Sequence, residues 1–230
     1  MKKTPIAVLA IACLVPALAT GAFARQHTVT YGPWMHVKLF IGPEEDKVQD
    51  MKVRSLNVDG HIKEFVSGDV HDVTDTTFVI RRAYRLNDAL PEDRSVKPEW
   101  RWQHGGWLVV DRGTGRVSQL NLPEFDPFYS IASWYRDYVA YCGVSIGNNK
   151  LYAVVYQLGY RKPVIRENIG SANTEELPDT VCAQPVWQKQ PPRVTFQPVG
   201  GKPLSFAIQG HASEVEPPQG PEDEKEQPPQ

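Results

Sequence analysis

Side chains able to bind a metal ion are densest between residues 69 and 75. Asp69, His71 and Asp72 bring one imidazole and two carboxylates together, a ligand set that zinc or another divalent ion accepts. On an extended segment Asp69 and His71 share one face, whereas Asp72 points to the other. No second histidine cluster follows nearby, so a polar turn is the competing interpretation. The chemistry that this cluster would support is metal-assisted hydrolysis.

A tryptophan-rich segment is the candidate ligand-binding surface. Trp100, Trp102 and Trp107 lie close together and are joined by Gly105 and Gly106. Exposed tryptophans form flat platforms for sugars or peptides, and aromatic side chains anchor protein interfaces. In an all-β protein the same rings often form the core instead. Both interpretations stay open.

A G-x-S-x-G pattern at residues 143–147 places Ser145 where serine hydrolases carry their nucleophile. That motif requires a helix after the serine, whereas residues 150–157 have the pattern of a strand. Ser145 is therefore expected in a hairpin loop. No glycine-rich phosphate loop is present either. The sequence predicts no catalytic residue and no cofactor.

The N-terminus has the pattern of an export signal. Lys2 and Lys3 precede an uncharged apolar run over residues 6–19, and small residues follow at positions 22–24. This order is typical of a cleaved signal peptide over residues 1–24, and it predicts a periplasmic or secreted bacterial protein. An uncleaved anchor and lipidation at Cys13 are the alternatives. No other stretch approaches membrane-spanning length, so no stable membrane span is expected after cleavage.

Two cysteines follow the signal segment, Cys142 and Cys182. In an oxidising compartment an even pair predicts a disulfide. Closing a loop of about 41 residues would stabilise the fold by roughly 4 kcal/mol in the chain-entropy model. Two separate buried thiols are the alternative.

Charge and composition restrict the partners. The chain of 230 residues carries 25 basic and 27 acidic side chains, so it lacks the basic surplus of a nucleic-acid-binding protein. Residues 213–230 are rich in Pro, Glu and Gln, which predicts a disordered acidic tail. The predicted organisation is a signal peptide over 1–24, a single all-β domain over 25–212 and this tail.

Strand periodicity dominates that domain, with about thirteen short strands separated by turn residues. Asp59-Gly60, the Arg112–Gly115 segment and Gly200-Gly201 are expected to be hairpin turns. The predicted strands are 29–31, 35–41, 51–58, 61–66, 76–85, 107–111, 116–122, 129–133, 138–144, 150–157, 162–168, 193–197 and 203–209.

The strand at 150–157 is apolar on both faces, because Leu151, Ala153 and Val155 alternate with equally apolar neighbours. A sheet covered on one side only would alternate with polar residues. We therefore expect this strand to lie between two layers. The predicted fold is an all-β antiparallel meander, arranged as a layered sandwich or a partial propeller-like stack.

Residues 130–141 resemble one blade of a β-propeller, with a serine-tryptophan pair, an acidic turn and a short apolar strand. Residues 108–117 are similar to the outer hairpin of such a blade. The sequence departs from the usual Pro-Asp-Gly turn at residues 135–137, which read Tyr-Arg-Asp. Segments 70–75, 85–91, 126–129 and 161–164 also resemble secreted bacterial proteins of unknown function, and this resemblance implies an extracytoplasmic family.

Together these patterns favour an exported, non-catalytic β module with a binding or structural role. The alternatives are a metal-assisted hydrolase using Asp69, His71 and Asp72, and a subunit of an envelope assembly whose open sheet edge pairs with a partner. An envelope protein or a glycan fits as partner, and nucleic acid does not. The sequence does not name the ligand.

Overall fold

The computed structural model describes residues 27–40, 48–87, 100–172 and 181–210. These residues form fourteen strands and one short 3-10 turn, η1 (Ile146–Asn148), which confirms the all-β prediction. The predicted signal peptide and the acidic tail lie outside the described residues. No helix among the described residues is long and apolar enough to cross a membrane.

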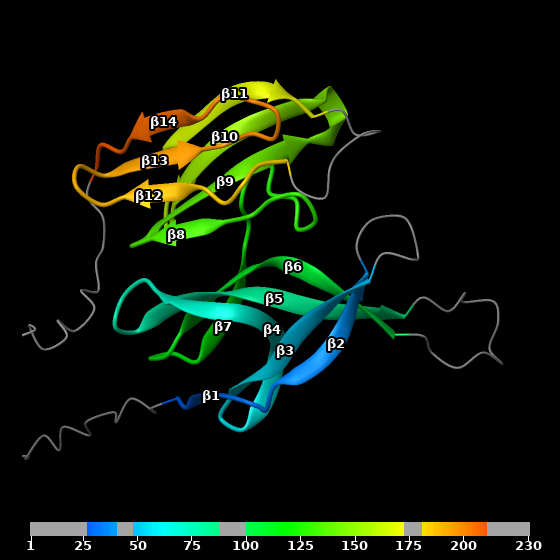
Figure 1. Ribbon diagram of the computed structural model, residues 1–230. Helices are drawn as coiled ribbons and strands as arrows, with labels where there is room; N and C mark the ends of the chain where they lie inside the picture. The colour runs from blue at the N-terminus through cyan, green and yellow to red at the C-terminus, as the bar shows by residue number, and fades with distance from the viewer. Residues whose placement is uncertain (1–26, 41–47, 88–99, 173–180, 211–230) are drawn as a thin grey trace, which may run out of the picture.

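The strands form three sheets (Figure 1). The first sheet contains β1 (Val29–Tyr31), β2 (Met35–Phe40), β3 (Val48–Val58), β4 (His61–Asp72), β5 (Thr77–Asn87), β6 (Trp100–Asp111) and β7 (Arg116–Leu120). The central sheet contains β8 (Ser133–Tyr135), β9 (Tyr138–Ser145), β10 (Lys150–Gln157) and β11 (Ile165–Ser171). The outer sheet contains β12 (Val186–Gln188), β13 (Arg193–Phe196) and β14 (Leu204–Ala207).

Five strands of the first sheet, β2 to β6, close into a ring. Each pairs antiparallel with the next along the chain, and β2 then pairs with β6 in parallel, with Leu39 opposite Trp102. An odd number of up-and-down strands brings the first and last to run in the same direction. The closing pair must therefore be parallel, whereas the other strand pairs among the described residues are antiparallel as expected. Each of the five strands is thus paired on both sides for part of its length.

Local turn chemistry places the hairpins where the sequence predicts them. Asp59 and Gly60 join β3 to β4 with φ values of 53° and 78°, the positive values that a tight primed turn requires. Between β6 and β7, the Asp111 carboxylate accepts hydrogen bonds from the backbone N–H groups of Gly113 and Thr114 at 2.7 and 3.1 Å. Each turn fixes the register of the strands that it joins.

The central sheet is buried on both faces, as the apolar pattern of residues 150–157 predicts. One face packs against the first sheet through Val79, Trp107, Val139, Tyr141 and Val154. The other packs against the outer sheet through Ala140, Cys142, Ala153, Val194 and Phe196. In Figure 1 the outer sheet lies on one side of β9 and β10 and the first sheet lies below them. The fold is a layered stack of three sheets.

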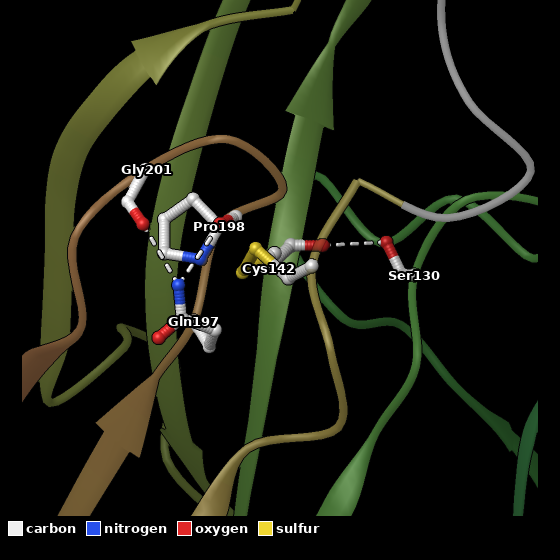
Figure 2. Close-up of a disulfide and its surroundings, with 6 residues drawn as sticks. Ser130, Cys142, Gln197, Pro198 and Gly201 are labelled. Carbon is white, nitrogen blue, oxygen red and sulfur yellow. Dashed lines mark hydrogen bonds between the residues drawn. A yellow bond between two sulfur atoms is a disulfide. The ribbon is translucent and has the colours of Figure 1, made fainter.

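The Cys142–Cys182 disulfide is present and joins β9 to the segment before β12. The two Cα atoms are 6.1 Å apart, and Ser130 Oγ donates a hydrogen bond to the carbonyl of Cys142 at 2.7 Å. Figure 2 shows this contact beside Gln197, whose amide reaches the carbonyl groups of Pro198 and Gly201. The bridge ties the outer layer covalently to the central sheet.

One predicted strand is wrong. Residues 129–133 were expected to be extended, but strand β8 begins only at Ser133 and the turn begins at Arg136, with φ 56°. The cause is Asp126, whose carboxylate accepts hydrogen bonds from the backbone N–H groups of Phe128 and Tyr129. Such side-chain bonds hold a turn in place of a strand.

Candidate functional site

The three predicted metal ligands point to different partners. Asp69 is exposed, and Asp72 forms an ion pair with Arg112 at 2.7 Å. His71 stacks on Trp134 and donates its Nε2–H to the carbonyl of Arg136 at 2.7 Å. Among the described residues no group of three or more metal-ligating side chains comes together. Asp72 therefore contributes a contact within the first sheet, and His71 a contact between the first and central sheets.

The three tryptophans of β6 occupy three environments. Trp107 is 9% exposed and lies edge-on to Trp134 in the interface between the first and central sheets. Trp102 packs edge-on against Phe65 in the small core of the ring. Trp100 is 50% exposed and lies under the guanidinium of Arg85. The structure therefore does not assemble one platform from them, and Trp100 is the exposed member.

A different site lies on the ring itself. A cleft of about 330 Å³ is lined by residues from all five ring strands. Its lining includes Leu39 of β2, Met51 and Lys52 of β3, Ser67 of β4, Arg81 of β5 and His104 of β6. We call this the ring cleft. Ligand sites in β proteins favour such positions, where strands close around a concave end.

Two β-bulges flank Arg81 and shape the ring cleft. On β4 the register shifts between Ser67 and His71, and Gly68 there has a φ of 71°. On β6 the register shifts beside Arg81, where Gly105 and Gly106 stand opposite Arg82. Bulges bend a strand and re-aim its side chains, and they occur often beside functional sites. Both neighbours of β5 therefore bend at the level of Arg81.

The bulge at Gly105 depends on glycine. A Cβ added there would lie 3.0 Å from the Cβ of Arg82 and 3.2 Å from its carbonyl oxygen. That is closer than such atoms normally approach, so β5 and β6 would have to separate. Gly68 needs glycine for its positive φ. The local sequence thus specifies the bends that create the ring cleft.

Register brings the polar side chains of the ring cleft to one face. Ser67 and Arg81 are direct Cα partners across β4 and β5. His104 pairs with Ala83, which lies two residues from Arg81 on the same face of β5. Direct partners on one face have Cβ atoms about 5 Å apart, and diagonal neighbours stay within reach of long side chains.

Three buried polar atoms of this cleft have no hydrogen-bond partner among the described residues: Ser67 Oγ, Arg81 Nε and His104 Nδ1. Ser67 is only 3% exposed. Leaving a buried donor or acceptor unpaired costs about 1–3 kcal/mol each, so native proteins normally satisfy such groups. All three residues line the ring cleft, so a molecule bound there would be next to these unpaired groups.

The electrostatics of the ring cleft are those of an uncompensated cation. Burial lowers the pKa of Arg81 to about 10, and no carboxylate among the described residues pairs with it. Its one hydrogen bond there runs from Nη2 to the carbonyl of Pro127 at 2.6 Å. Burial, with a smaller contribution from the Arg81 charge, lowers the pKa of His104 to about 4. At neutral pH His104 is therefore uncharged and Arg81 provides the buried charge.

Ser67 has no general base within hydrogen-bond reach among the described residues. Ser67 Oγ does not form a hydrogen bond with His104, because β5 lies between β4 and β6. The hydroxyl has no hydrogen-bond partner among the described residues. A serine nucleophile needs a base within hydrogen-bond reach. The ring cleft instead offers donors and one charge over an apolar floor of Leu39 and Met51.

Sequence reasoning missed Ser67, Arg81 and His104. The available signal was the glycines within strand patterns, Gly68 and the pair Gly105-Gly106, because glycine inside a strand often marks a bulge or a close approach. Only the register of β4, β5 and β6 shows that the two bulges lie at the same level. In comparisons with known proteins, no family model, curated protein or solved structure matches this chain.

Proposed function

We propose that this protein is an exported, non-catalytic binding module whose ligand occupies the ring cleft. The observation that carries the proposal is the convergence of three buried, unpartnered polar atoms from Ser67, Arg81 and His104 on that cleft. A stable scaffold tolerates such groups when a ligand satisfies them. Three stacked sheets hold the ring rigidly, and rigid strands position recognition groups well.

Export is supported by the basic and apolar pattern of residues 1–24 and by the Cys142–Cys182 disulfide. Disulfides persist in oxidising compartments and are rare in the cytosol. Fractionation of bacteria that express the full chain is expected to give a shortened, disulfide-bonded form in the periplasm or medium. A full-length, reduced form that stays in the cytosol would contradict export.

Binding is tested by titrating the isotope-labelled purified protein with a panel of small polar compounds, acidic, basic and neutral, and following its amide resonances by NMR. The expected result is that at least one compound perturbs residues around Ser67, Arg81 and His104 together. Ser67→Ala and His104→Asn should weaken that compound's binding. If every perturbation falls elsewhere, for example around Trp100, the ring cleft is not the ligand site.

A further inference from the structure

The geometry points to a small organic monocarboxylate as the ligand class of the ring cleft, with its carboxylate on Arg81, Ser67 and His104 and its short apolar body on Leu39 and Met51. This inference rests on the proposed function, since it names the chemistry of the ligand that the ring cleft binds. It is argued from charge, from donor geometry and from size.

Charge comes first. Arg81 is a half-buried cation that contacts no carboxylate among the described residues, and a partly desolvated charge without a counter-charge is costly. At the rim, Asp50 is engaged by Lys38 at 2.6 Å, while Lys52 is exposed and adds positive charge. His36 stands opposite Lys52 across β2 and β3, and Gly68 beside Ser67 carries no charge. One buried positive charge with a neutral His104 matches one negative charge.

Donor geometry comes second. Arg81 Nε lacks a partner, and Nη2 has two N–H bonds, of which the carbonyl of Pro127 uses one. Nε and Nη2 form the side edge of the guanidinium, and this edge binds the two oxygens of a carboxylate in parallel. The Ser67 hydroxyl, on the paired position of β4, can donate to the same oxygens. His104 can present Nδ1–H from the other neighbouring strand.

Size and polarity come third. A cleft of about 330 Å³ is at the small end of ligand sites, which usually span about 300–1,000 Å³. Leu39 is 4% exposed and Met51 is 7% exposed, so their side chains form a dry floor beside the polar group. An acid with a few carbon atoms fits this combination. A larger ligand would protrude from the cleft. A more highly charged ligand would bring charge that Arg81 does not balance.

The test compares butyrate with its neutral analogue butyramide and with inorganic phosphate, by NMR titration of the whole protein at pH 7. Butyrate should shift the Arg81 Nε–H resonance and the amides of Ser67 and His104. Butyramide should bind at least about tenfold more weakly, because it lacks a charge-assisted hydrogen bond. Inorganic phosphate should bind more weakly than butyrate, because it has no apolar body to pack on Leu39 and Met51.

Variants separate a charge effect from a change in folding. Arg81→Met keeps an apolar stem and should abolish the preference for butyrate over butyramide. Arg82→Met is the matched control, because Arg82 is the neighbouring residue on the opposite face of β5 and pairs with Glu64. It should leave butyrate binding unchanged. Amide spectra of both variants establish that the fold persists, and Ser67→Ala provides a second, milder loss of affinity.

The titrations distinguish failure of the carboxylate assignment from failure of the proposed function. Equal binding of butyrate and butyramide in the ring cleft overturns the carboxylate assignment and leaves the proposed function intact. Stronger binding of phosphate than of butyrate overturns the assignment of a carboxylate with an apolar body. If neither acid binds while a neutral or basic compound of the panel does, the inference fails alone. If no compound perturbs the ring cleft, the inference and the proposed function fail together.

Discussion

Ser67 and Arg81 face each other across β4 and β5 at the point where both strands flanking β5 depart from regular pairing. The serine is almost completely buried and the arginine has no acidic partner among the described residues. A pair of this kind contributes little to the stability of the unliganded fold, because both groups lose water without full compensation. In the proposed function, these two groups bind the ligand.

Replacing Arg81 with methionine should make the unliganded protein more stable, by about 1 kcal/mol, because a buried unpaired charge becomes an apolar side chain of similar length. Urea unfolding followed by fluorescence measures the change. Arg82→Met should have the opposite sign, since it leaves the half-buried Glu64 without its partner. A large loss of stability in Arg81→Met would mean that the bond to Pro127 outweighs the cost of burying the charge.

Acidification should destabilise the protein through His104. Its pKa is lowered to about 4 in the folded state, from about 6.5 when unfolded, so the unfolded chain binds the proton first as pH falls. Stability that is complete above pH ~6.5 is lost progressively down to pH ~4, by about 2 kcal/mol after solvent screening. His104→Asn should show a weaker pH dependence over this interval. Unfolding curves at several pH values measure it, and identical pH profiles would contradict the assignment to His104.

Gly105→Ala should cost about 1–3 kcal/mol, because the new methyl group collides with the backbone and Cβ of Arg82. Gly106→Ala is a matched control one residue away. An added Cβ there meets only the amide nitrogen of Gln119, at 3.9 Å. Thermal unfolding compares the two. Equal melting temperatures would show that the bulge widens without cost.

Substitution of the buried and exposed tryptophans of β6 should destabilise the protein to different extents. Trp107→Ala is expected to cost about 3–5 kcal/mol, because it removes a buried ring from the interface between the first and central sheets. Trp100→Ala should cost less than about 1 kcal/mol, since its ring is half exposed and contacts Arg85. Chemical denaturation of the two variants provides the measurement. A costly Trp100→Ala would indicate that this ring is part of a core.

The sequence predicts those features of the structure that depend on neighbouring residues. Asp59-Gly60 specifies its turn through its own backbone, and the apolar run of β10 specifies a middle layer through its own two faces. The Cys142–Cys182 bond follows from pairing two cysteines. These features are local or have few alternatives, so pattern reasoning reaches them.

The ring cleft does not have a local signal. Ser67, Arg81 and His104 meet only because β4, β5 and β6 pair in one register and bulge at one level. Periodicity indicates that a strand exists but leaves its register open by several residues. For the same reason the sequence leaves open whether the three tryptophans form a platform or belong to the core, whereas strand pairing and the bulge place them in different surroundings.

The parallel pair that closes the ring has a consequence for folding. Leu39 and Trp102 are far apart in sequence, whereas the other ring pairs join strands that follow one another along the chain. Hairpins assemble quickly, and contacts across a long intervening segment form late because more chain entropy must be lost. The pairing of β2 with β6 is therefore expected to form last during folding and to open first. A ligand that contacts both Leu39 on β2 and His104 on β6 should stabilise the pairing of these two strands. Amide hydrogen exchange at that pair should therefore slow when the ligand binds.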